Sequence, residues 1–188
     1  TSGQIVYFSA FLYTLGLLDA GKDITAGIVT NNRPVGKDAD TMLGCFLNSV
    51  PFRIQIPKGG SWDSFVHAVT KKYNLHKKYP RTLYDLNRQI NGGKSDGNPF
   101  FDVLFNFVDF YVYNDLNPAE NSLETGDDDR SGTLGFGRAN TLFDFTVNQT
   151  DNTTQLQLRL WQELSSGISL DQFIGFYLEV LAQIISGQ

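Results

Sequence analysis

The chain has 188 residues, a length typical of one large domain or two small ones. Hydrophobic residues account for 41% of them, a proportion that supports a packed core and excludes wholesale disorder. The formal charge of −5 argues against a general nucleic-acid binder, and no apolar run approaches the ~20 residues of a membrane-spanning helix.

The single cysteine and the start of the chain indicate its cellular setting. Cys45 alone can form neither an internal disulfide nor a thiolate zinc site, which fits a reducing, cytoplasmic compartment. The chain begins at Thr1 without the basic segment and cleavage site of a signal peptide. We therefore expect a cytoplasmic protein of which this chain is a segment.

The first three predicted elements are a helix and two strands. Residues 5–18 carry apolar side chains on nearly every face, which predicts a buried helix. Residues 24–31 are a short apolar run suited to an interior strand. Apolar and polar residues alternate over 46–56, as in a strand, where Pro51 cannot donate to a ladder and therefore predicts an edge strand or a bulge.

Two helices and an aromatic strand come next. Ser61 predicts the N-cap of an amphipathic helix that ends at Pro80, and a shorter helix is expected over 82–90. After a Gly/Ser/Asp turn at 92–97, aromatic and β-branched residues alternate over 101–107, which predicts a strand packed on one face.

The second half is expected to contain a long connection, a hairpin and a last helix. Residues 112–138 have no periodicity and form a long loop or crossover segment. Alternating patterns over 142–150 and 155–162 predict two antiparallel strands. Ser169 and Gln172 form a capping-box signature before eight side chains that we expect to pack on the sheet: Leu170, Phe173, Ile174, Tyr177, Leu178, Leu181, Ile184 and Ile185.

This order of elements predicts a single α/β domain over 1–188. The hairpin is antiparallel, and the helical crossovers favour parallel neighbours. We therefore expect a two-layer sandwich with a mixed β-sheet.

Motifs for catalysis are scarce. No G-x-S-x-G elbow is present, and Gly93, Lys94 and Ser95 lack the first glycine of a phosphate loop. His67 is expected at a helix surface or boundary, and His76 is expected to act as a cation at the end of that helix. Cys45 is expected to be a small buried thiol. Acidic residues at 127–129 lack the spacing of a calcium loop, so no metal site is predicted.

A basic cluster on the predicted 61–80 helix has two interpretations. It is either the solvated side of an amphipathic helix or a surface that steers an acidic partner or a phosphate. Its members are Lys71, Lys72, Lys77, Lys78 and Arg81.

Three ordered segments form a more specific pattern. They read G-I-V-T-N-N-R-P at 27–34, L-G-C-F-L-N-S-V-P-F-R at 43–53 and N-P-F-F-D-V-L-F-N-F at 98–107. They resemble the G-x-P-x-A-N-R-P, G-x-F-V-N-T-x-P-x-R and N-P-L-F-D-V-x-F-N segments of the condensation domains of nonribosomal peptide synthetases. The resemblance extends through the Phe143-Asp144-Phe145 strand, the hairpin and the last helix, and so covers essentially the whole chain.

The resemblance implies the C-terminal lobe of a chloramphenicol-acetyltransferase-like fold. In that family the proposed catalytic histidine belongs to H-H-x-x-x-D-G on the N-terminal lobe, and a tunnel runs between the two lobes. Neither His67 nor His76 is followed by Asp-Gly, so no catalytic residue is expected in this chain. The positions expected near the tunnel or the lobe interface are Asn31, Arg33, Gly44, Asn48, Arg53, Pro99 and Asn106. Without its partner lobe, the chain is expected to leave an apolar or aromatic face uncovered.

The resemblance also implies partners. These are the N-terminal lobe, an adjacent adenylation domain and carrier-protein domains, with neither nucleic acid nor membrane. The basic cluster from Lys71 to Arg81 would dock a carrier. No cofactor is expected to bind this chain directly, because phosphopantetheine would arrive on the carriers. Two alternatives remain: a catalytically silent docking module for a carrier protein, and an acyltransferase that uses free coenzyme A thioesters.

Overall fold

The computed structural model describes residues 2–18, 22–34, 36–39, 41–92, 100–109, 141–150, 153–160 and 169–187. Its elements, in chain order, are α1 (Gly3–Leu18), β1 (Asp23–Asn31), β2 (Leu47–Gln55), α2 (Trp62–Lys78), α3 (Leu83–Asn91), β3 (Val103–Asp109), β4 (Phe143–Gln149), β5 (Thr154–Leu160) and α4 (Leu170–Ser186). Each predicted helix and strand is present. The expected connection at 112–138 lies outside the described residues.

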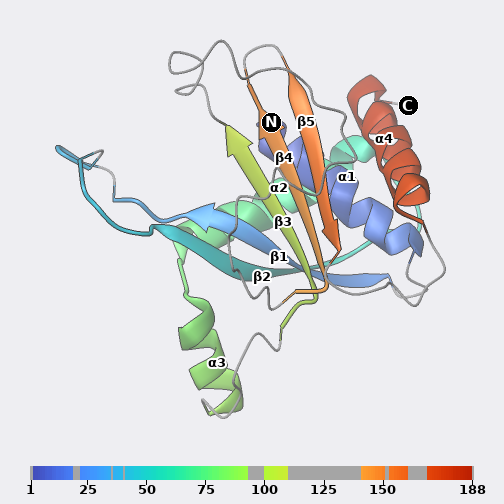
Figure 1. Cartoon of the computed structure of the whole chain (residues 1–188). Coiled ribbons are helices and arrows are strands. Elements are labelled where there is room, and N and C mark those ends of the chain that lie inside the picture. Colours follow the sequence, from blue (N-terminus) through green and yellow to red (C-terminus); the bar gives the residue numbers. More distant parts are fainter. Residues whose placement is uncertain are drawn as a thin grey trace.

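The strands form one mixed sheet in the order β2-β1-β3-β4-β5. The outer pairs β1–β2 and β4–β5 are antiparallel, and the inner pairs β1–β3 and β3–β4 are parallel. Helices α1, α2 and α4 lie together on one side of the sheet (Figure 1). This arrangement confirms the prediction of an α/β fold with a mixed sheet. Pro51 lies on the edge strand β2, opposite Gly27 of β1, as its missing N–H requires.

Helix α1 is the centre of the helical layer. It packs against α2, α4 and the sheet, and its buried residues lie on several faces, which confirms the predicted buried helix. Inside it, the Thr14 hydroxyl donates to the carbonyl of Ala10 at 2.8 Å, so this buried polar group is satisfied.

The other helices begin at predicted caps. Ser61 accepts a hydrogen bond from the backbone N–H of Ser64, and Ser169 and Gln172 form the expected capping box of α4. In contrast, the expectation that eight side chains of α4 are buried is wrong for Leu170, Leu178 and Ile185, which are exposed. A helix buries one stripe against its neighbour, and Leu178 and Ile185 lie to one side of the stripe that carries Phe173, Tyr177 and Val180.

The side of the sheet opposite the helices does not match the uncovered apolar face that we expected. In its central groove, polar residues outnumber Leu104 and Val108. The exposed large apolar side chains of the described residues lie instead in separate places, including the 36–46 segment, α3 and α4. Within the described residues, no helix has the length and apolarity to cross a membrane.

Two of the sequence motifs meet at Gly27. A Cβ atom built on this residue would lie 2.3 Å from the ring of Phe101, which belongs to the 98–107 segment. Any side chain here would therefore displace a buried aromatic ring. The glycine of the first motif is required by close packing against the third.

This packing predicts that Gly27→Ala lowers the free energy of unfolding by about 1 to 3 kcal/mol, the usual cost of overpacking. Gly175→Ala is the matched control, because its Cβ would meet nothing within 4 Å and alanine favours the interior of α4. Chemical denaturation measures both. A Gly27→Ala protein as stable as the Gly175→Ala protein would contradict the prediction.

Candidate functional site

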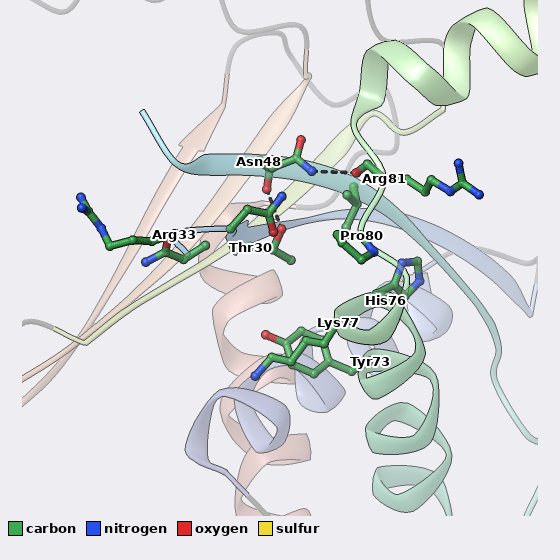
Figure 2. Close-up of a pocket in the computed structure, with 11 residues that line it drawn as sticks. Thr30, Arg33, Asn48, Tyr73, His76, Lys77, Pro80 and Arg81 are labelled. Atoms are coloured by element: carbon green, nitrogen blue, oxygen red, sulfur yellow. Dashed lines mark hydrogen bonds between the residues drawn. The ribbon is translucent and has the colours of Figure 1, made fainter. Parts of the chain in front are cut away.

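A cleft of about 420 Å³ lies where the end of β1 and the start of β2 meet the C-terminal end of α2 (Figure 2). It brings together residues that are far apart in the sequence. Its lining is Thr30, Asn31, Asn32, Arg33, Asn48, Val50, Tyr73, His76, Lys77, Pro80 and Arg81. Five predicted positions are among them: Asn31, Arg33, Asn48, Lys77 and Arg81. None of the described residues that line the cleft carries a carboxylate.

Asn48 joins the sheet edge to the connection between α2 and α3. Its side-chain Nδ2 donates to the carbonyl of Arg81 at 2.7 Å, and the hydroxyl of Thr30 donates to the carbonyl of Asn48 at 3.2 Å. These bonds place one wall of the cleft (Figure 2). The asparagine of the second motif thus has a structural role within this chain.

The end of α2 supplies the opposite wall. The Tyr73 side chain is buried, and its hydroxyl donates to Oε1 of Gln4 on α1 at 3.0 Å. Burial raises the pKa of Tyr73, so it remains a neutral phenol at physiological pH. The Lys77 ammonium lies 5.0 Å from the centre of the Tyr73 ring, and Pro80 follows the end of the helix.

His76 is half-buried beside the sheet. Its ring centroid lies 5.5 Å from that of Phe52, and burial, together with the charge of Lys72, lowers its pKa. The expectation that His76 is a helix-end cation is therefore wrong, because desolvation disfavours the imidazolium. Among the described residues, its imidazole forms no hydrogen bond. His67, in contrast, is exposed on α2, as predicted.

Arg33 lies at the rim of the cleft, but its guanidinium contacts residues outside the cleft. Nη1 donates to the carbonyls of Ala39 and Met42 at 2.7 and 2.9 Å, and Cζ lies 4.3 Å from the centre of the Phe46 ring. Arg33 thus holds the described residues 36–39 and 41–46 as an arm that extends beyond the sheet (Figure 1).

The arm explains two further predicted positions. Gly44 has a φ of 149°, a conformation that other residues rarely adopt. The backbone conformation of the arm therefore favours glycine at this position. The expectation that Cys45 is a buried thiol at the start of a strand is wrong. Strand β2 begins only at Leu47, and Cys45 is exposed in the arm.

Arg53 lies outside the cleft, on the solvent side of β2. Its Nη2 and Nε donate to the two carboxylate oxygens of Asp23 at 2.6 and 2.9 Å, a bidentate pair across the sheet edge. These hydrogen bonds hold the pKa of Asp23 below its usual value. Lys72 of α2 donates to the backbone carbonyl of Arg53. This hydrogen bond links β2 to α2 at the position of the ion pair.

Asn106 is not brought to the cleft. Asn106 lies on the side of the sheet that faces away from the helices, in a groove of about 350 Å³. The groove is lined by Leu104, Asn106, Val108, Asp144, Thr146, Asn148, Gln157 and Arg159. Pro99 lies outside the described residues.

The basic cluster does not act as one group. Lys77 and Arg81 line the cleft, although the Arg81 side chain extends away from Tyr73 and Lys77 (Figure 2). Lys72 is bound to the Arg53 carbonyl, Lys78 lies 5.4 Å from the ring of Tyr79, and Lys71 is exposed. Across the described part of the chain, no group of three or more His, Cys, Asp or Glu residues is arranged to hold a metal ion.

Several cleft residues were not selected from the sequence: Thr30, Asn32, Val50, Tyr73, His76 and Pro80. Tyr73 and Val50 follow the apolar periodicity of their elements, so they look like ordinary core residues. Thr30, Asn32 and Val50 lie within the first two motif segments but were not singled out there, and Tyr73, His76 and Pro80 lie outside all three segments.

The comparisons with known proteins identify the family. The model of the condensation domain matches residues 1–187. Tyrocidine synthase 2 of Brevibacillus parabrevis is 33% identical over 73 residues, which are 38% of this chain and 2% of that protein. The hybrid PKS-NRPS synthetase lepA of Aspergillus flavus is 32% identical over 87 residues, 45% of this chain and 2% of that protein.

The fold agrees with this match. The solved condensation domain from Monacolin K polyketide synthase MokA is similar with a TM-score of 0.71 and 16% identity, over 98% of this chain and 42% of that one. The chain therefore belongs to the condensation-domain family. It spans less than half of that solved chain and about 2% of the curated synthetases it matches.

The Arg33 contacts predict that Arg33→Lys loosens the arm, because an ammonium cannot reproduce two hydrogen bonds and a stacked guanidinium. We expect amide hydrogen exchange within 36–46 to accelerate by about tenfold, with unchanged exchange in α1. This corresponds to roughly one lost charged hydrogen bond. Exchange measured by mass spectrometry that is equal in the two proteins would contradict this role.

The Asp23 pair predicts a pH effect with a definite sign. Because the pKa of Asp23 is lowered in the folded state, its contribution to stability is present above the unfolded pKa near 3.8 and is lost as pH falls through the folded pKa. NMR titration of the Asp23 carboxylate should show this low pKa, and Arg53→Gln should return it toward its usual value. Lys71→Gln, at an exposed cation of α2 outside this pair, is the matched control and should leave the Asp23 titration unchanged.

Proposed function

We propose that this chain is the C-terminal half of a condensation domain that forms peptide bonds in nonribosomal peptide synthesis. The observation that carries the proposal is the match of the condensation-domain model to residues 1–187 in a chain that spans 42% of a solved condensation domain. Its substrates would be aminoacyl and peptidyl thioesters tethered to carrier proteins through phosphopantetheine.

The reaction is acyl transfer. The amine nitrogen of one thioester attacks the carbonyl carbon of the other, the C–N bond forms and the C–S bond breaks. The amine loses a proton, and the departing thiolate gains one. Alignment of two tethered chains can supply several kcal/mol of the barrier, and donors directed at the developing oxyanion supply more. Amide groups and cations of the kind that line the cleft suit these tasks.

In this proposal the base comes from the other half of the domain. Among the described residues, His76 is the one histidine that lines the cleft, and no hydrogen bond there orients its imidazole. A general base must be held within hydrogen-bond reach of the proton it removes. His76 packs on Phe52, so we assign it to the wall of the cleft rather than to proton transfer.

The partners follow from the same proposal. They are an N-terminal half bearing H-H-x-x-x-D-G, carrier-protein domains and an adjacent adenylation domain. The arm exposes Met42 and Leu43, and the start of β2 exposes Leu47. Exposed apolar groups of this kind favour contact with another domain. Leu43 is 99% exposed.

A second candidate is a docking module without catalysis. The observation that favours it is that the cleft lining, in the described part of the chain, combines no imidazole with a carboxylate. The two candidates differ in the coding sequence upstream of Thr1. An H-H-x-x-x-D-G segment in the same reading frame supports the enzyme, and a reading frame without that segment supports the docking module.

The proposal predicts that the full-length polypeptide forms the peptide bond with loaded carrier proteins and that the 188-residue chain alone does not. His76→Asn in the full-length polypeptide should retain condensation within about threefold, since a wall residue contributes little of the 10²- to 10⁴-fold expected of a general base. Mass spectrometry of the carrier-bound product measures both.

Two results would contradict this proposal. Turnover by the 188-residue chain alone would show that it contains its own base. A loss of 100-fold or more in the His76→Asn protein, with an unchanged melting temperature, would place His76 in the chemistry. His67→Asn, at an exposed position of the same helix, is the matched control.

A further inference from the structure

The cleft between the sheet edge and the end of α2 carries an excess of positive charge. Its described lining includes three cationic side chains, those of Arg33, Lys77 and Arg81, and no residue with a carboxylate. The ion pair found among the described residues joins Arg53 to Asp23, outside the cleft. A concave site with this charge attracts an anion and disfavours a cation.

Several polar groups of the lining already donate inside the protein. The Thr30 hydroxyl donates to the Asn48 carbonyl at 3.2 Å, and Asn48 Nδ2 donates to the Arg81 carbonyl at 2.7 Å. The Tyr73 hydroxyl donates to Gln4 at 3.0 Å. These side chains shape the cleft and are not its first source of donors for a ligand.

The polar groups that remain are mainly donors. Oδ1 of Asn31 accepts from the backbone N–H of Arg33 at 3.0 Å, which leaves Nδ2 of Asn31 to donate to a ligand. The Lys77 ammonium lies 5.0 Å from the centre of the Tyr73 ring (Figure 2), and no carboxylate of the described residues pairs with it. Donors with a positive charge suit a carboxylate, which only accepts hydrogen bonds.

The base of the cleft is apolar. Val50 and Tyr73 are each 5% exposed, and the ring of His76 lies against that of Phe52. Burial lowers the pKa of His76, so its imidazole is neutral. The volume of about 420 Å³ is that of a small-molecule site. An apolar base below a rim of donors fits a short aliphatic chain that ends in a carboxylate.

We propose that the cleft selects a substrate whose side chain bears a carboxylate, of the aspartate or glutamate kind, an inference that rests on the function proposed above. The carboxylate pairs with Lys77, and Nδ2 of Asn31 is a further donor to it. The methylene groups of the side chain lie against Val50 and Tyr73. A cationic side chain is rejected, because it would meet Lys77 in a lining whose described residues offer it no carboxylate.

The first test measures binding to the 188-residue chain of two probes that differ in one group. They are the α-methyl esters of N-acetylglutamate and N-acetylglutamine, the acid probe and the amide probe. The chain has two histidines, so NMR titration follows His76 in the cleft and the exposed His67 as the internal reference. We expect the acid probe to shift His76 and to bind with a Kd at least tenfold lower than that of the amide probe.

Variants of Lys77 assign the selectivity. Lys77→Gln should raise the Kd of the acid probe about tenfold, as the loss of a hydrogen bond to a charged group predicts, and should leave the Kd of the amide probe within about twofold. Lys77→Arg keeps the charge and should stay within about threefold. Lys78→Gln is the matched control, because Lys78 is exposed at the next position of α2 and lies outside the cleft lining. It should leave both values within about twofold.

The second test measures specificity in the full-length polypeptide. Carrier proteins are loaded with glutamate or glutamine at each substrate position in turn, and mass spectrometry gives kcat/KM for peptide-bond formation. At one of the two positions, Lys77→Gln should lower the ratio of glutamate to glutamine about tenfold, and Lys77→Arg should retain it. An equal loss for the two amino acids would show that Lys77 is merely structural and would contradict the proposal.

Three binding results would also overturn the proposal. The first is an equal Kd for the acid probe and the amide probe. The second is an equal loss of acid-probe binding in Lys78→Gln, which would reduce the effect to the net charge of the helix end. The third is displacement of the acid probe by inorganic phosphate with a lower Kd that also depends on Lys77, which would identify a site for a phosphoryl group instead.

The two tests separate this inference from the proposed function. Lys77-dependent binding of the acid probe, with a full-length polypeptide that forms no peptide bond, would support the carboxylate site and contradict the proposed function. Peptide-bond formation with a glutamate-to-glutamine ratio that Lys77→Gln leaves unchanged would contradict the carboxylate site and leave the proposed function standing.

Discussion

The aromatic core around Phe11 is the interaction on which the rest of the structure depends. The ring of Phe11 is fully buried on α1, and its centroid lies 5.3 to 6.3 Å from those of Phe105, Phe143, Phe145 and Phe173. These rings come from α1, two parallel strands and α4, so one side chain joins both layers. Burial of each ring contributes about 1.5 to 3 kcal/mol. The position of α1 set by this core also fixes α2, which supplies half of the cleft.

Within that frame, most motif residues have a structural task. Gly27 admits the ring of Phe101, Arg33 holds the arm through two carbonyls, and Asn48 joins β2 to the α2–α3 connection. Arg53 pairs with Asp23 across the sheet edge. Each side chain satisfies a contact inside this chain. These motif residues therefore stabilise the fold of this chain. That role does not require their polar side chains to contact a substrate.

The elements were predictable where the signals are local. Ser169 with Gln172 and the alternation in the β4–β5 hairpin depend on neighbours a few residues away, so the sequence indicates them directly. The arm and the cleft depend on contacts between distant segments. Arg33 bonds to the Met42 carbonyl, and Tyr73 faces Thr30 across the cleft only after α2 packs on α1. Cys45 was misplaced for this reason: its apolar neighbours suggested a strand, but the guanidinium of Arg33 organises a loop.

The electrostatics of the cleft suit binding better than proton transfer. Burial keeps Tyr73 protonated and disfavours the charged form of His76, while Lys77 stays near the ring of Tyr73. The lining thus offers hydrogen-bond donors and positive charge, and its described residues include no carboxylate that could orient the imidazole. Such a surface can align a carbonyl and stabilise negative charge that develops on it. Under the proposed function, the other half of the domain would supply the proton acceptor, and this lining would supply alignment and charge stabilisation.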